Sequence, residues 1–199
     1  MLVKICGIKT VEAAQVAVQA GADFIGFVFA PSKRRITPEE AAKIAKAIPK
    51  SVRTVGVFVN ESTENIKKIA EMVGLDVIQL HGDESPKMVA ELPYQTIKAF
   101  SIDQVDARTI YSYQTDYYLI DSPVGEHRGG TGKTFDWKRA TELEIDLNKV
   151  ILAGGLSPDN VKAAIGQVGP AGIDVSSGVE TNGEKDHEKM IQFIRNAKG

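Results

Sequence analysis

Short runs rich in Val, Ile and Phe alternate with longer stretches of helical spacing along the whole chain. The apolar runs predict eight strands, at residues 2–6, 23–29, 52–59, 76–80, 95–101, 117–121, 149–153 and 172–176. Stretches between them, such as 38–48 and 62–73, carry apolar residues three and four positions apart, which is typical of amphipathic helices. The sequence therefore predicts one strand–helix unit that repeats from end to end.

Several of the helical stretches carry signals for where a helix begins or ends. Thr37 is followed by Pro38 and two glutamates, a pattern that predicts an N-cap, a proline in the first turn and favourable early acids. Ser157, followed by Pro and Asp, predicts a second start of the same kind. Gly21 and Gly74 fall where the preceding helices should end.

Strict alternation of strands and helices favours a parallel sheet, because parallel neighbours need a crossover connection. Eight units of about 25 residues each favour a closed (β/α)₈ TIM barrel over an open doubly wound sheet. The open sheet would also want G-x-G-x-x-G after its first strand, where the chain reads Cys6-Gly7-Ile8-Lys9. Because the sequence contains no segment typical of a domain linker, we expect one domain over 1–199. The one long connection, 122–135, is predicted to be a loop over the mouth of the barrel.

Charge and composition narrow the range of partners. The formal net charge is −2, with acidic and basic residues interleaved, so the sequence gives no reason to expect a nucleic-acid partner. No apolar run approaches the roughly 20 residues of a membrane helix, and Met1 leads directly into a strand rather than a secretory signal. A single cysteine favours a reducing compartment, and we expect a cytoplasmic protein.

Polar residues stand where the strands of a barrel interior should be apolar. In a barrel, alternate side chains point inward and the chemistry lies at the C-terminal ends of the strands. Each such residue has a structural alternative, since a lone cysteine is usually a packing residue and an aspartate at a strand end is often a cap. Convergence on one mouth nevertheless favours a site, and it also predicts an internal charge pair between Lys4 and Asp174. The converging residues are Lys4, Cys6, Gln79, His81, Asp121, Asp174 and Ser176.

Two glycine-rich segments end the last two predicted strands, at 153–157 and 176–179. Glycine lets the backbone approach an anion closely, and the loops after strands 7 and 8 of such barrels frequently bind phosphate. Two tight turns are the structural alternative. We expect a phosphate group to bind here, at Gly154, Gly155, Ser176, Ser177 and Gly178.

Two other kinds of site are disfavoured. The run Gly129–Thr134 contains Gly-Lys-Thr, but a nucleotide-binding P-loop needs a glycine five residues before Gly132, and that position is His127. The histidines His81, His127 and His187 lie far apart without metal-ligand spacing. We therefore expect neither a bound nucleotide nor a metal.

The chain resembles the phosphoribosylanthranilate isomerase family of tryptophan biosynthesis, in matching segments that run through it in the expected order. These segments are 3–7, 26–29, 32–34, 55–60, 79–82, 130–137, 152–156 and 174–180. The resemblance implies a (β/α)₈ fold, no cofactor and an Amadori rearrangement. In that reaction N-(5-phosphoribosyl)anthranilate becomes 1-(2-carboxyphenylamino)-1-deoxyribulose 5-phosphate.

The resemblance also implies roles for individual residues. Asp121 would be the acid, kept protonated by burial, and Cys6 the base, given thiolate character by a nearby cation or helix terminus. Arg34, rather than Arg35, would bind the anthranilate carboxylate, because the alignment on Ser32-Lys33 favours it. His81 and Asp174 would bind substrate or orient these groups. The expected partner is a small phosphorylated substrate, and the expected assembly is a monomer or homodimer.

Other functions remain to be weighed against this one. Another sugar-phosphate barrel, such as an indole-glycerol-phosphate synthase or a ribulose-phosphate epimerase, would want a catalytic lysine and glutamate or metal ligands on its strand ends. A non-catalytic barrel could keep the phosphate loops for binding alone, although Cys6 and Asp121 argue against it. An interaction scaffold has no supporting feature in the sequence.

Overall fold

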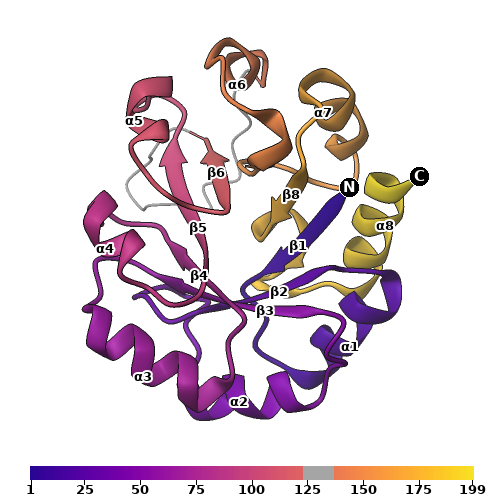
Figure 1. Ribbon diagram of the computed structural model, residues 1–199. Helices are drawn as coiled ribbons and strands as arrows, with labels where there is room; N and C mark the ends of the chain where they lie inside the picture. Colours follow the sequence, from indigo (N-terminus) through magenta and orange to yellow (C-terminus); the bar gives the residue numbers. More distant parts are fainter. Residues whose placement is uncertain (123–136) are drawn as a thin grey trace.

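The computed structural model describes residues 1–122 and 137–199, and within them eight parallel strands close into a barrel in chain order. The first and last strands pair with each other, Lys4 opposite Asp174. The helices surround the strands as an outer ring (Figure 1). The predicted (β/α)₈ fold is confirmed, and each strand lies within one residue of its predicted bounds. The strands are β1 Leu2–Cys6, β2 Phe24–Val28, β3 Arg53–Phe58, β4 Val77–Leu80, β5 Gln95–Ser101, β6 Tyr117–Asp121, β7 Val150–Leu152 and β8 Gly172–Val175.

The described helices follow the strands in the order that the alternation predicts. They are α1 Val11–Ala20, α2 Pro38–Lys46, α3 Thr63–Val73, α4 Pro86–Ala90, α5 Ala107–Tyr111, α6 Lys138–Glu142, α7 Val161–Val168 and α8 His187–Lys198. Two short 3₁₀ helices, η1 Leu147–Lys149 and η2 Ser177–Val179, precede β7 and follow β8. None of the described helices is long and apolar enough to cross a membrane.

The helix signals are confirmed at three of the four predicted positions. Thr37 caps α2 in a capping box with Glu40, and the left-handed glycines Gly21 and Gly74 end α1 and α3. The predicted start at Ser157 is wrong, because the N-cap of α7 is Asn160. The Asn160 amide folds back on the turn before the helix, where its oxygen accepts the Ser157 N–H and its nitrogen donates to a carbonyl.

The barrel interior changes from apolar to polar along its axis. Inward side chains from successive strands, including Phe24, Val55, Ile97 and Leu119, form a buried apolar layer. Towards the C-terminal ends of the strands, the interior positions carry Lys4, Gln79, Asp174 and other polar groups. The larger apolar cluster lies between the strands and the helices. This layering places the buried polar groups at the mouth, where the loops after the strands meet.

A hairpin that the strand pattern did not predict follows β8. Its strands, β9 Glu180–Thr181 and β10 Glu184–Lys185, pair antiparallel across a turn at Asn182 and Gly183, which both have positive φ. Two residues per strand are too few for an alternating pattern to be visible. The predicted 122–135 loop lies outside the described residues apart from Ser122, as do the Gly129–Thr134 run and His127.

Candidate active site

Lys4 and Cys6 point into the barrel from β1, beside the bare backbone of Gly26 on β2. The Lys4 side chain is fully buried, and its Nζ lies 2.9 Å from Asp174 Oδ1, so the predicted internal charge pair is confirmed. A Cβ atom at Gly26 would lie 3.2 Å from Cys6 Sγ and 3.3 Å from Lys4 Cε. The thiol and the lysine side chain therefore share one small space, which a larger residue at position 26 would crowd.

Burial dominates the protonation of the Cys6 thiol. Removal from solvent raises its pKa, the Lys4 ammonium lowers it, the Asp174 carboxylate raises it again, and the net pKa lies above the ordinary value. The cation that the sequence interpretation required is present, but its effect does not outweigh burial. In the free protein Cys6 is consequently a thiol at neutral pH.

Asp121 closes β6 and contacts its neighbours through both carboxylate oxygens. Oδ1 accepts hydrogen bonds from the Ser122 N–H (2.7 Å) and hydroxyl (3.2 Å), and Oδ2 lies 3.6 Å from His81 Nε2. Burial raises the pKa of Asp121. His81 and Ser122 together lower this pKa by more than burial raises it, so the net pKa is below the ordinary value. The expectation that burial keeps this group protonated is therefore wrong for the free protein.

Arg34 lies in the loop after β2, and its burial separates it from its exposed neighbour Arg35. Its Nε and Nη2 donate to the two carboxylate oxygens of Glu180, at 2.7 and 3.0 Å. A Cβ at Gly7 would lie 2.7 Å from Arg34 Cδ, so the arginine crosses the chain directly after Cys6. One edge of the guanidinium is thus taken by Glu180, and the Nη1–Nη2 edge remains for a ligand carboxylate.

Glu180 also binds Lys185, and the hairpin thereby joins Arg34 to the end of β1. Lys185 Nζ lies 2.7 Å from Glu180 Oε1 and donates to the Ser176 carbonyl at 2.9 Å, while the Ser176 hydroxyl donates to the Cys6 carbonyl at 3.1 Å. Burial alone would raise the pKa of Glu180, but the hydrogen bonds from Arg34 and Lys185 bring it to about 2. Burial lowers the pKa of Lys185 and Glu180 raises it, and the net pKa lies below the ordinary value.

The two glycine-rich loops pack against each other beside Asp121. Gly154 and Gly155 both have positive φ, at 83° and 64°. A Cβ at Gly178 would lie 1.8 Å from the Leu156 carbonyl oxygen, and one at Gly154 only 3.0 Å from Asp121 Oδ1. Between the described residues we find no hydrogen bond donated by the N–H groups of Gly154, Gly155, Ser177 or Gly178. These donors are available to an anion.

The structure brings together the residues that the sequence singled out, and it adds others. Cys6, Arg34, Asp174 and Ser176 gather around the ends of β1, β2 and β8, and His81 joins Asp121 across the ends of β4 and β6. Sequence reasoning missed Glu180 as the partner of Arg34, and Lys185 as the second partner of Glu180. It also missed the buried pair Lys98–Glu84 beside His81. The available signal was a lysine in the buried middle of strand β5, between Ile97 and Ala99.

A (β/α)₈ barrel that collects a thiol, a carboxylate and two glycine-rich loops at its mouth has the architecture of an enzyme that acts on a small phosphorylated molecule. A family model described as N-(5'phosphoribosyl)anthranilate (PRA) isomerase matches residues 3–196. The chain belongs to the phosphoribosylanthranilate isomerase family.

Individual relatives agree with this membership. The N-(5'-phosphoribosyl)anthranilate isomerase of Listeria welshimeri is 48% identical over 200 residues, which cover 100% of this chain and 99% of that protein. A crystal structure of monomers generated from the dimeric isomerase of Thermotoga maritima is 40% identical, with a TM-score of 0.85 and full coverage of both chains. Another solved structure is a phosphoribosylanthranilate isomerase in complex with reduced 1-(o-carboxyphenylamino)-1-deoxyribulose 5-phosphate. It is 38% identical to this chain, with a TM-score of 0.83 and full coverage of both chains.

Proposed function

We propose that Cys6 and Asp121 are the base and the acid of the isomerisation that this family catalyses. The observation that supports the assignment is their placement. Both side chains are buried at the C-terminal ends of barrel strands, on β1 and β6, with β7, β8 and the glycine-rich loops between them on one side of the barrel. A sugar whose phosphate lies on those loops can reach both groups.

The chemistry needs one proton donor and one proton acceptor. The substrate is a furanosylamine, so a proton must reach the ring oxygen as the C1–O bond breaks and an iminium forms. The iminium makes the C2 proton acidic, and a base removes it to give an enolamine that tautomerises to the ketone. Asp121 donates to the ring oxygen in this scheme, and Cys6 accepts the proton from C2.

In the free protein the proton resides on Cys6, whereas the reaction requires it on Asp121. Cys6 is a thiol and Asp121 a carboxylate, whereas the reaction starts from thiolate and carboxylic acid. The two forms carry the same number of protons and differ in where one proton resides. We therefore expect a bell-shaped pH profile of kcat/KM, with Asp121 titrating on the acid limb and Cys6 on the alkaline limb.

The remaining site residues would bind the two ends and the middle of the substrate. The free edge of Arg34 faces the anthranilate carboxylate, Asp174 the sugar hydroxyls, and the glycine-rich loops the phosphate. Phosphate binding holds the sugar between acid and base, so binding energy from the far end is used in catalysis. We further propose one catalytic domain over 1–199, a cytoplasmic location, and a monomer or homodimer.

The test is turnover of freshly prepared phosphoribosylanthranilate, followed by the loss of its fluorescence without added metal or cofactor. Cys6→Ser and Asp121→Asn should each lower kcat by at least about 100-fold, the low end of what acid–base groups contribute. Lys198→Met, which removes an ion pair with Asp23 whose two side chains are 34% and 32% exposed, is the matched control and should keep full activity. A Cys6→Ser variant within a few-fold of the parent would show that Cys6 is a packing residue.

A further inference from the structure

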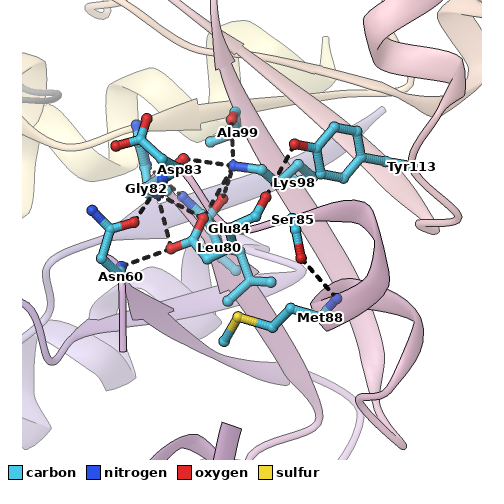
Figure 2. A network of polar contacts seen from close by, with 12 residues as sticks. Asn60, Leu80, Gly82, Asp83, Glu84, Ser85, Met88, Lys98, Ala99 and Tyr113 are labelled. Atoms are coloured by element: carbon cyan, nitrogen blue, oxygen red, sulfur yellow. Dashed lines mark hydrogen bonds and ion pairs between the residues drawn. The ribbon is translucent and has the colours of Figure 1, made fainter. Parts of the chain in front are cut away.

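Another buried ion pair lies beside the proposed acid, on the outer side of the barrel wall. Lys98 Nζ on β5 is 3.1 Å from Glu84 Oε2 in the loop between β4 and α4, and the two side chains are only 3% and 1% exposed. Figure 2 shows the pair at the centre of a network of polar contacts. A buried ion pair adds little net stability, because desolvation of both charges offsets their attraction. Stability alone is thus a weak reason for these two charges to be here.

The Lys98 ammonium binds the backbone on both sides of His81. It donates to the carbonyl of Leu80 at 3.4 Å and to the carbonyl of Gly82 at 2.8 Å, the residues directly before and after the histidine. It also donates to the carbonyl of Ala99 on its own strand at 3.2 Å. One cation therefore ties the peptide unit before His81, and the peptide unit after Gly82, to β5.

Glu84 holds the same segment from its other end. Its Oε1 accepts the Asn60 N–H at 2.8 Å, and both oxygens accept the Gly82 N–H, at 3.1 and 2.9 Å. The Asn60 amide oxygen accepts the Asp83 N–H at 2.7 Å, and the Tyr113 hydroxyl donates to the Glu84 carbonyl at 3.0 Å. A Cβ at Gly82 would lie 2.3 Å from Asn60 Oδ1, so the backbone at Gly82 packs directly against Asn60.

The side chain that this segment carries faces the proposed acid. His81 Nε2 lies 3.6 Å from Asp121 Oδ2, and Nδ1 lies 3.1 Å from the Gln79 Nε2 amide. Because that amide donates, Nδ1 accepts, and a neutral His81 carries its proton on Nε2, toward Asp121. A rotation of either flanking peptide would move the imidazole away from the carboxylate.

We infer that Lys98 and Glu84 are positioning residues of the acid–base reaction, which fix the backbone around His81 so that its imidazole stays against Asp121. The inference rests on the proposed role of Asp121 as the acid. Neither residue needs to touch the substrate. Their effect reaches the chemistry through the geometry of His81, and a displacement of about 1 Å at a catalytic group can lower a rate by about 100-fold.

The test compares Lys98→Met and Glu84→Gln with two controls in steady-state kinetics and ¹⁵N NMR. The controls are Lys198→Met, which removes a distant cation, and Ile66→Val, which removes one methyl group from a fully buried position on α3. We expect kcat to fall at least about 10-fold in both test variants. KM should change little, because Arg34 and the phosphate loops are untouched. The His81 ring nitrogens, assigned with His81→Gln, should show one tautomer in the parent and a mixture in the test variants.

The outcomes separate this inference from the assignment beneath it. An unchanged kcat and an unchanged His81 spectrum in folded test variants would overturn the positioning role, even if Asp121→Asn is inactive. An active Asp121→Asn would instead overturn the proposed acid. If Lys98→Met does not fold, Glu84→Gln, which keeps the size of the side chain, decides the question by the same two measurements. If kcat of Ile66→Val falls in proportion to its loss of stability, as in the test variants, then kcat merely follows the stability of the fold. That result would also contradict the inference.

Discussion

Lys4→Met tests the electrostatics around Cys6 with a substitution that keeps most of the side-chain volume. Lys4 is fully buried, and Asp174, its partner at 2.9 Å, is 10% exposed. Methionine removes the ammonium and leaves the carboxylate nearly buried without a counter-charge. The change should therefore affect both the stability of the fold and the reactivity of the thiol.

The stability effect follows from the burial of the pair. Breaking a buried ion pair by removing one partner costs about 3–5 kcal/mol, because the other charge stays desolvated and unpaired. Since Asp174 keeps some solvent contact, we expect a value near the lower limit, about 3 kcal/mol. A typical domain has only about 5–15 kcal/mol of stability, so the loss should be clear in urea unfolding. Adding Asp174→Asn should recover much of it, because no unpaired charge then remains.

The effect on Cys6 has its own sign and its own assay. The Lys4 ammonium is the strongest influence that lowers the pKa of the Cys6 thiol, so its removal must raise that pKa further. Alkylation of this single cysteine by iodoacetamide should become slower at neutral pH, and its pH midpoint should move upward. Equal or faster alkylation in a folded Lys4→Met protein would refute the placement of the cation beside the thiol.

The pKa of Glu180, about 2 against an ordinary 4.5, means that its contribution to stability is complete above about pH 4.5 and lost as the pH falls toward 2. Glu180→Gln should therefore be less stable than the parent at neutral pH, and urea unfolding should show the difference narrowing across that window. A constant difference would contradict this. Arg34→Ala should weaken binding of the product by about 2–4 kcal/mol in calorimetry, and Arg35→Ala should change it little; the reverse result would mean that Arg35 reads the carboxylate. In crystals soaked with sulfate, an anion should lie against the N–H groups of Gly154, Gly155, Ser177 and Gly178, and one bound only elsewhere would contradict the phosphate site.

Hydrophobic periodicity was sufficient to predict the barrel, because strands of a parallel sheet are buried on both faces and appear as apolar runs. The charge pair Lys4–Asp174 was predictable for a related reason. Both residues face the interior, and β1 and β8 become neighbours only if the barrel closes. Helix ends were predictable where a side chain caps the helix directly, as Thr37 does. The start of a helix was not predictable where a turn precedes it, as the turn before Asn160 precedes α7.

The contacts that sequence could not supply are those made by long side chains across elements. Lys98 faces outward from β5, and nothing in the strand period says that its ammonium reaches the loop after β4. Glu180 lies in a hairpin too short to leave a pattern, so its pairing with Arg34 depends on three-dimensional placement. The protonation states of Cys6 and Asp121 could not be predicted from the sequence either. The effect of burial on the pKa outweighs the effect of the neighbouring groups at Cys6, whereas the neighbouring groups outweigh burial at Asp121.

The pairing of buried charges also connects ligand binding to the protonation of Cys6. Lys4 and Asp174 act on the thiol with opposite signs, so their effects partly cancel and burial is left to set the direction of the pKa shift. A sugar hydroxyl that donates to Asp174, as proposed, would draw part of the carboxylate's charge toward the ligand and away from Cys6. The Lys4 ammonium would then act on the thiol with less opposition, which favours the thiolate. In such an arrangement the base is formed when the substrate is in place, and the thiol stays neutral and unreactive in its absence.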